Sequence, residues 1–326
     1  MGMTFGMRNK LVLSLIRFAL TAGILFLSAS APLVLAQKTG KLRVATSLFP
    51  LQEFAQAVGG ENVQSDLLLP PGVEPHTWEP KPSDVAKIAA ADIFIYIGPM
   101  MEPWAGNIIK AAGNTNLRVV EASRGLDLLR ANGQEPDQKT ALEKHHPGGW
   151  DPHVWLDFSM DRKIIDSIAA AFSAKDPQHA SFYRARAESY KDKLTALDQK
   201  YGEALSKCQN REIILGGHSA FAYLARRYGL KQVALYGVSP NAEPTPKKLT
   251  SVIETSRRHK AKYIFFETLV NPKLALVLAK EAGVGTLVLH AGHNLTKDLQ
   301  QKKVTFLDLM ASNLGNLTRG LECHGS

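Results

Sequence analysis

One stretch of this chain constrains the fold more than any other, because it lacks the residues that interrupt helices. Residues 178–207 contain no proline and a single glycine, Gly202, and they are rich in alanine, lysine, arginine, glutamate and leucine. These residue types favour helix, and a helix of this length extends roughly 40 Å. The apolar residues do not keep a heptad spacing, which argues against a coiled coil. We therefore expect one long helix that crosses from one domain to another.

Strand and helix patterns alternate on both sides of this helix. Strands are expected at 41–46, 63–69, 92–97 and 117–120 before it, and at 212–215, 231–235, 263–266 and 286–289 after it. Most of these strands are followed by a segment with helical spacing, which indicates parallel βαβ units. The sequence thus predicts an α/β protein with two parallel-sheet lobes. We place the lobes at 37–175 and 208–326, joined by a single long linking helix at 176–207.

The first 36 residues have the pattern of a secretory signal peptide. Basic residues end at Arg17, an apolar run covers 18–35, and small residues precede a cleavage point before Gln37. A retained membrane anchor is the alternative, but serines and a proline interrupt the apolar run. No cysteine lies near the cleavage point, so a lipid anchor is not expected. We expect a secreted, periplasmic protein.

The charge pattern argues against a nucleic-acid partner. The 326-residue chain has a formal net charge of +9, and three of these charges belong to the first 36 residues. The other basic residues are scattered through helical segments, and no basic cluster is interleaved with aromatic residues. Nucleic-acid binding is therefore not expected.

Cys208 and Cys323 are the only cysteines in the sequence, and they lie near the two ends of the expected second lobe. In an oxidising compartment two cysteines usually pair. We expect a disulfide that holds the C-terminus in place, with two free thiols as the alternative.

Two short segments share the pattern acid, proline, histidine, any residue, tryptophan. They are residues 74–78, which carry His76, and residues 151–155, which carry His153. The proline restricts the backbone beside the histidine. The acid could hold the second ring nitrogen, and the tryptophan could shield the ring from water. A metal-binding histidine needs such a fixed tautomer and orientation, so the pair of segments predicts metal ligands.

Further histidines follow the expected strands of the second lobe. His218 comes directly after two glycines at the end of one strand, and His290 and His293 follow the last strand. Because ligands of open parallel sheets bind at the carboxyl ends of the strands, one ion between the lobes could take ligands from both. Three imidazoles and one further donor form a tetrahedral, zinc-like set.

Three motifs, in this order, resemble the metal-binding motifs of substrate-binding proteins of zinc and manganese ABC importers. They are EPHTWEPKPSD at 74–84, DPHVWLD at 151–157 and GGHSAF at 216–221. The resemblance covers essentially the whole chain after the signal peptide. It implies a single metal ion between two lobes joined by a rigid helix, with His76, His153 and His218 as the first three ligands. Manganese-selective members typically carry a carboxylate at the third position, so His218 implies Zn²⁺.

The fourth ligand departs from the family pattern. The family often supplies an aspartate from the loop after the last strand, whereas this loop reads HAGHNLT at 290–296. His293 falls where the aspartate would be and is the expected fourth ligand. His290, Glu267 or a water molecule are the alternatives. The long His-rich loop of many zinc members is reduced here to His145 and His146.

The resemblance implies a periplasmic protein, expected to be a monomer, that captures Zn²⁺ and passes it to an ABC importer membrane permease. Affinity is expected to fall below about pH 6, because the imidazoles must be neutral. A homologue for Mn²⁺ or Fe²⁺ is the first alternative. A secreted zinc hydrolase is a second, although no HExxH helix supports it. The missing lipid-attachment cysteine disfavours a surface-displayed adhesin.

Overall fold

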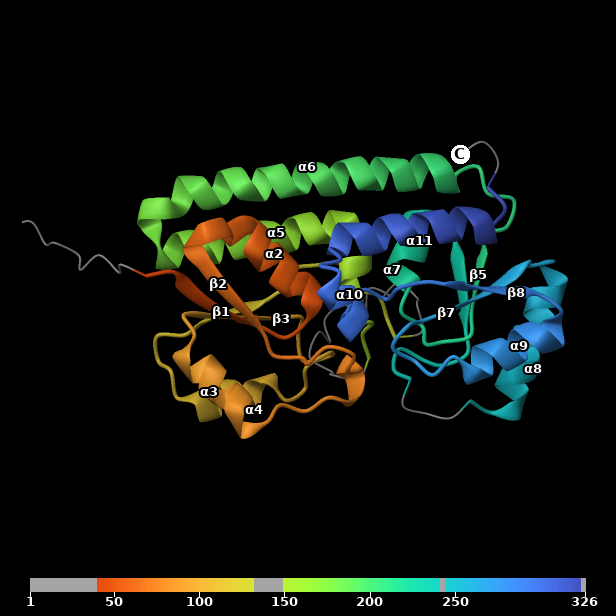
Figure 1. The fold of residues 1–326 in the computed structure, drawn as a ribbon, viewed down its shortest axis with the longest axis horizontal. Coiled ribbons are helices and arrows are strands. Elements are labelled where there is room, and N and C mark those ends of the chain that lie inside the picture. Colours follow the sequence, from red (N-terminus) through yellow and green to blue (C-terminus); the bar gives the residue numbers. More distant parts are fainter. Residues whose placement is uncertain (1–39, 132–148, 241–243, 324–326) are drawn as a thin grey trace, which may run out of the picture. The chain divides into compact units, whose positions relative to one another are not determined.

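The computed structural model of the protein describes residues 40–131, 149–240 and 244–323. The expected signal peptide, His145 and His146 lie outside these residues. The described part of the chain forms two α/β lobes, each built on a sheet of four parallel strands (Figure 1). The predicted fold class is therefore confirmed.

The first lobe contains β1 (Leu42–Thr46), α2 (Phe49–Gly59), β2 (Val63–Leu67), α3 (Pro82–Ala90), β3 (Ile93–Tyr96), α4 (Ala105–Ala112), β4 (Arg118–Glu121) and α5 (Phe158–Lys175). Its strands lie in the order β2-β1-β3-β4. Successive side chains of a strand face opposite sides of the sheet. Val44 and Ile93 accordingly join the core formed with α2 and α5, whereas their neighbours Ala45 and Phe94 join the core formed with α3 and α4.

The second lobe contains β5 (Glu212–Leu215), α7 (Ala222–Arg227), β6 (Lys231–Ala234), α8 (Pro246–Arg258), β7 (Tyr263–Phe266), α9 (Lys273–Ala282), β8 (Gly285–Val288), α10 (Lys297–Gln301) and α11 (Phe306–Gly320). Its strand order, β6-β5-β7-β8, repeats the arrangement of the first lobe. Ile213 faces the core shared with α7 and α11, and Ile214 faces the core shared with α8 and α9. The short helix α10 has no counterpart in the sequence prediction.

The predicted linking helix is α6 (Ala180–Leu205), which runs over α5 and then over α11 (Figure 1). Its buried side chains, spaced by three or four residues, are Tyr183, Ala187, Tyr190, Leu194, Leu197, Tyr201 and Leu205. Tyrosines and an alanine make up much of this stripe, so the large aliphatic residues alone do not show its spacing in the sequence. One apolar cluster continues from the first lobe through this helix into the second.

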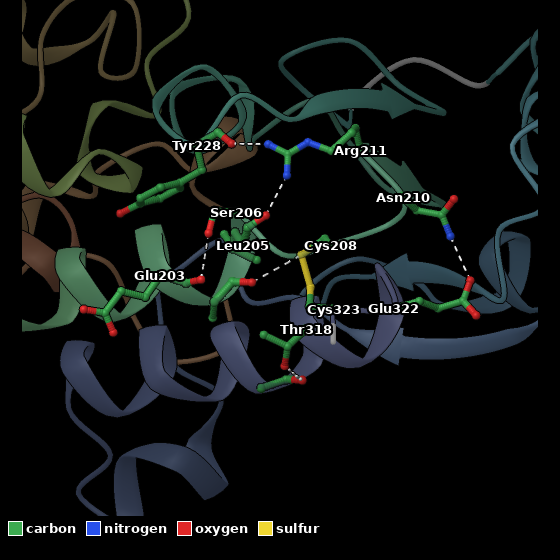
Figure 2. Close-up of a disulfide and its surroundings, with 12 residues drawn as sticks. Glu203, Leu205, Ser206, Cys208, Asn210, Arg211, Tyr228, Thr318, Glu322 and Cys323 are labelled. Carbon is green, nitrogen blue, oxygen red and sulfur yellow. Dashed lines mark hydrogen bonds between the residues drawn. A yellow bond between two sulfur atoms is a disulfide. The ribbon is translucent and has the colours of Figure 1, made fainter. Parts of the chain in front are cut away.

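A disulfide joins the segments that follow α6 and α11 (Figure 2). Cys208 and Cys323 form it, which confirms the predicted pairing. Beside it, Asn210 donates a hydrogen bond to Glu322 at 2.9 Å, and the Arg211 guanidinium donates to the carbonyl of Leu205 at 2.6 Å. The bridge therefore ties the end of the linking helix to the end of the last helix.

No helix within residues 40–131, 149–240 and 244–323 is both long enough and apolar enough to cross a membrane.

Candidate metal centre

Three of the predicted ligands converge at one point. The Nε2 atom of His153 lies 3.2 Å from Nε2 of His76 and 3.1 Å from Nε2 of His218. Donor atoms of all three lie within 4.8 Å of one another. Zinc–nitrogen bonds of about 2.0–2.1 Å in a tetrahedral site separate neighbouring nitrogens by about 3.3 Å. The two Nε2–Nε2 separations that involve His153 are thus close to the spacing that a tetrahedral zinc ion requires.

His153 is oriented by its own motif. It precedes a short 3-10 helix, Val154–Leu156, and its side chain is fully buried. Asp151 Oδ1 accepts a hydrogen bond from the His153 backbone N–H at 2.9 Å and lies 2.7 Å from the ring Nδ1. The Trp155 ring lies edge-on at 5.3 Å. A proton on Nδ1, facing Asp151, leaves the Nε2 lone pair for a metal ion.

His218 is oriented in the same way by a residue of a different strand. Glu267 follows β7 and reaches across to the segment after β5. Its Oε1 accepts a hydrogen bond from the His218 backbone N–H at 2.9 Å, and its Oε2 lies 2.7 Å from the ring Nδ1. The Nε2 atom of His218 is therefore also directed to the point of convergence.

The first copy of the motif works differently from the expectation. His76 lies in the 3-10 helix Pro75–Thr77, and Glu74 caps that helix by accepting the His76 backbone N–H at 3.3 Å. The other carboxylate oxygen of Glu74 lies 3.6 Å from Nε2 of His293, so Glu74 faces His293 rather than the His76 ring. The Trp78 ring packs edge-on against Trp104 in the core under α3 and α4. The predicted roles of the acid and the tryptophan therefore hold only in the second copy.

His293 lies next to the three converging histidines. It is buried, and its ring is stacked at 6.1 Å on that of His218. With His218 and Glu267 it forms a second, overlapping group of donors within 4.8 Å. His290, half-buried, belongs to neither group, and its Nδ1 lies 3.4 Å from the hydroxyl of Thr268. Of the two histidines in this loop, His293 is thus the one beside the site.

The environment keeps most of these imidazoles neutral. Burial, together with the nearby His153 and His218, lowers the pKa of His76 to about 2. Burial also holds the pKa of His153 and of His293 well below the usual value. Burial, the largest single effect, lowers the pKa of His218 as well, but the carboxylates of Glu267, Glu74 and Asp151 together outweigh it, and the pKa is raised. His218 is therefore the first of the four to take up a proton as the pH falls.

Buried carboxyl groups surround the histidines. Burial raises the pKa of Glu74 and of Asp151 to about 7 each. A divalent cation bound among them would favour ionised carboxylates and neutral imidazoles at the same time. The local chemistry therefore suits a cation with nitrogen ligands.

Gly217 is required by the close approach of Glu267. A Cβ atom at this position would lie 2.2 Å from Glu267 Oε1, the atom that accepts the His218 N–H. We expect Gly217→Ala to displace the carboxylate and to weaken metal binding by about 10–100-fold, the usual effect of losing a partner of a ligating histidine. Competition with a zinc chelator measures this effect.

The matched control is Gly237→Ala, because no atom lies within 4 Å of a Cβ placed there. It is expected to bind zinc as the unaltered protein does. Equal affinity of the Gly217→Ala variant would show that the Glu267 contact does not support the site.

Two supporting residues carry no recognisable sequence signal. Tyr223, in α7 of the second lobe, donates its hydroxyl to the carbonyl of Asp151 at 2.8 Å and accepts the backbone N–H of Leu129 at 3.0 Å. Asn313, in α11, accepts the backbone N–H of His290 at 2.7 Å and donates to its carbonyl at 2.8 Å. Both partners are far away in the sequence, so no local pattern marks these contacts.

Proteins that bind a solute between two α/β lobes, with side chains from each lobe, form the class to which this architecture belongs. Comparison with family models shows which family within that class the chain belongs to. The chain belongs to the family described as Zinc-uptake complex component A periplasmic, whose model matches residues 44–320.

Curated relatives of the chain are named for zinc. It is 37% identical over 284 residues to the High-affinity zinc uptake system protein ZnuA of Bacillus subtilis, which covers 87% of this chain and 89% of that protein. It is 35% identical over 289 residues to the Zinc-binding lipoprotein AdcA of Streptococcus pneumoniae. That match covers 89% of this chain but 58% of AdcA, which is the longer protein.

Solved structures of similar proteins have the same fold. The metal-dependent lipoprotein YcdH of Bacillus subtilis matches with a TM-score of 0.73 and 36% identity over 86% of this chain and 99% of that one. The Zn(II)-bound ZnuA-like domain of Streptococcus pneumoniae AdcA matches with a TM-score of 0.73 and 34% identity, over 87% and 100%. The laminin binding protein Lmb of Streptococcus agalactiae, described as an adhesin with metal transporting activity, matches with a TM-score of 0.76 and 29% identity, over 86% and 99%.

Proposed function

We propose that this protein is a periplasmic zinc-binding protein that captures one Zn²⁺ ion and delivers it to the permease of an ABC importer. The convergence of three histidines carries this proposal, with Nε2 of His153 3.2 Å from that of His76 and 3.1 Å from that of His218. His76, His153 and His218 would hold the ion, and His293 would supply the fourth donor. We place the first lobe and its ligands in residues 37–175 and the second lobe and its ligands in residues 208–326. Residues 176–207 form the helix that links the two lobes.

The donor chemistry supports zinc over manganese. Imidazole nitrogen suits zinc, whereas carboxylate and carbonyl oxygen suit manganese. The three converging donors are nitrogens, and two of the carboxylates beside them are directed at histidine rings: Asp151 at His153 and Glu267 at His218. The names of the relatives agree with this choice.

A transport role is also favoured over hydrolysis. A zinc hydrolase needs a carboxylate that is free to take a proton from a metal-bound water. Asp151 and Glu267 each lie 2.7 Å from a histidine Nδ1, and Glu74 faces His293. The contacts of Asp151 and Glu267 with histidine rings, and the family of zinc-uptake components to which the chain belongs, favour transport. We also propose that residues 1–36 are a cleavable signal peptide, and that the protein acts as a monomer and does not bind nucleic acid.

Native mass spectrometry of protein purified without added metal tests the assignment directly. We expect one zinc ion per chain after titration with Zn²⁺, and zinc should displace manganese from a mixture of the two. Preferential retention of Mn²⁺, or no uptake of Zn²⁺, would refute the proposed function.

The pH dependence of binding should follow His218. Zinc binds an imidazole nitrogen only when it carries no proton. The pKa of His218 is raised, whereas those of His76 and His153 are lowered. Below the pKa of His218 one proton competes with the ion, so we expect the affinity to fall about tenfold per pH unit. Chelator competition between about pH 5 and about pH 8 measures the slope. A flat profile over that range would contradict this role of His218.

A further inference from the structure

The segment that carries His293 is hydrogen-bonded to the first lobe on either side of this histidine. The carbonyl of Ala291 accepts the indole N–H of Trp155 at 2.7 Å. The carbonyl of His293 itself accepts the backbone N–H of Phe49 at 3.1 Å. Residues 291–295, which belong to the second lobe by sequence, are thus held by the first lobe.

Asn294 makes the most extensive of these contacts. Its Nδ2 group donates to the carbonyls of Pro70 and Val73, at 2.8 and 2.9 Å. Its Oδ1 accepts the backbone N–H of Leu295 at 2.9 Å. The backbone N–H of Gly72 donates in turn to the carbonyl of Leu295 at 2.8 Å. Asn294 is 6% exposed, so both amide N–H groups and the amide oxygen find partners inside the protein.

The two carbonyls that Asn294 contacts belong to the turn that leads directly into Glu74 and His76. One amide therefore connects the backbone that presents His76 with the backbone that presents His293. We propose that Asn294 is a positioning residue of the metal centre, which fixes the spacing between these two ligand-bearing segments. The inference rests on the proposed function, and in particular on His293 as the fourth ligand.

The advantage of such a contact is that it involves protein groups only, so it does not require the ion in order to form. Ordering a loop during binding reduces the affinity, whereas a loop already ordered by folding does not carry that cost. The donors and acceptors of the Asn294 contacts are all protein groups, and the ring of His293, which precedes Asn294, lies 6.1 Å from that of His218. Groups that hydrogen-bond a ligating side chain typically change metal affinity by about 10–100-fold, and we expect an effect of that size from a contact that holds the backbone of two ligands.

Asn114 provides a matched control in the first lobe. Its Nδ2 group donates to the carbonyls of Ala89 and Ala91, at 3.0 and 2.8 Å, and its Oδ1 accepts the backbone N–H of Asn116 at 3.0 Å. The pattern of three hydrogen bonds is the same as that of Asn294, but the partners lie at the end of α3, before β3 and before β4. Asn294→Ala and Asn114→Ala therefore remove hydrogen bonds of the same number and kind at two different places in the protein.

Two measurements compare these variants: zinc affinity by chelator competition, and the visible absorption spectrum of bound Co²⁺, which reports the donors and their geometry. Asn294→Ala is expected to weaken zinc binding by about 10–100-fold and to change the cobalt spectrum. Asn114→Ala is expected to change neither, although both variants are expected to be less stable to heat. Unchanged affinity and spectrum for Asn294→Ala would overturn the inference. If that variant does not fold, Asn294→Ser, which keeps one donor, serves in its place.

A double-variant cycle tests whether Asn294 acts through His293. If it does, adding Asn294→Ala to His293→Ala costs no further affinity, whereas additive losses would contradict the inference. His293→Ala alone separates the two proposals. If this change leaves zinc affinity intact, the fourth ligand of the proposed function is wrong. If it weakens binding while Asn294→Ala does not, only the positioning role fails.

Discussion

Replacing His218 with alanine is expected to weaken zinc binding by about 10²–10³-fold. A four-ligand protein site binds zinc with roughly 10–16 kcal/mol, so one ligand of four accounts for about 2.5–4 kcal/mol. His218 Nε2 lies 3.1 Å from Nε2 of His153, and its loss would open one corner of the site. Calorimetric or chelator-competition titration at a fixed pH measures the change. Circular dichroism of the metal-free variant should show an intact fold, because His218 follows β5 in a loop.

A second histidine offers a control for this experiment. His259 follows α8 in the same lobe, and its Nδ1 lies 3.0 Å from the carboxylate of Glu212. His259→Ala thus removes a histidine with an acidic partner outside the metal centre and should leave zinc affinity unchanged. If both variants bind zinc as tightly as the unaltered protein, His218 is not a ligand.

Removing the disulfide is expected to lower the free energy of unfolding by about 5 kcal/mol. The bridge joins residues separated by 115 positions. In the chain-entropy model, closing a loop of this length lowers the conformational entropy of the unfolded chain, which raises its free energy by about that amount. The variant with both Cys208→Ser and Cys323→Ser should therefore unfold at a lower urea concentration. Urea titration followed by circular dichroism measures the difference.

Reduction of the unaltered protein supplies the comparison. A reducing agent should shift its urea transition towards that of the double serine variant and should leave the variant itself unaffected. If the variant and the oxidised protein unfold at the same urea concentration, the bridge does not contribute to stability. Zinc affinity is expected to be similar in both, because neither cysteine belongs to the two donor groups.

The sequence predicted much of the fold, for identifiable physical reasons. Strands such as β5 and β7 are buried on both faces and are therefore continuous apolar runs bounded by polar residues. The absence of helix breakers predicted α6 to within a few residues. Three of the histidines converge because the carboxyl ends of parallel strands, and the segments that follow them, meet at one edge of each sheet.

Other parts of the site could not be predicted, because they depend on contacts between distant segments. Glu74 and Asp151 occupy the same position in their motifs, yet only Asp151 contacts the ring of its own histidine. The difference arises because Glu74 faces His293, which lies more than two hundred positions away. The hydrogen bonds of Tyr223 and Asn294 cross from one lobe to the other, and neither residue has a distinctive sequence environment.

The bridge between Cys208 and Cys323 also changes the connectivity of the second lobe. Every strand and helix from β5 to α11 lies between the two cysteines, so this lobe is a covalently closed ring of chain. The first lobe has no such closure among its described residues, because these two cysteines are the only ones in the sequence. A protease that cuts the second lobe once therefore leaves both pieces attached, whereas a single cut in the first lobe separates the chain into two.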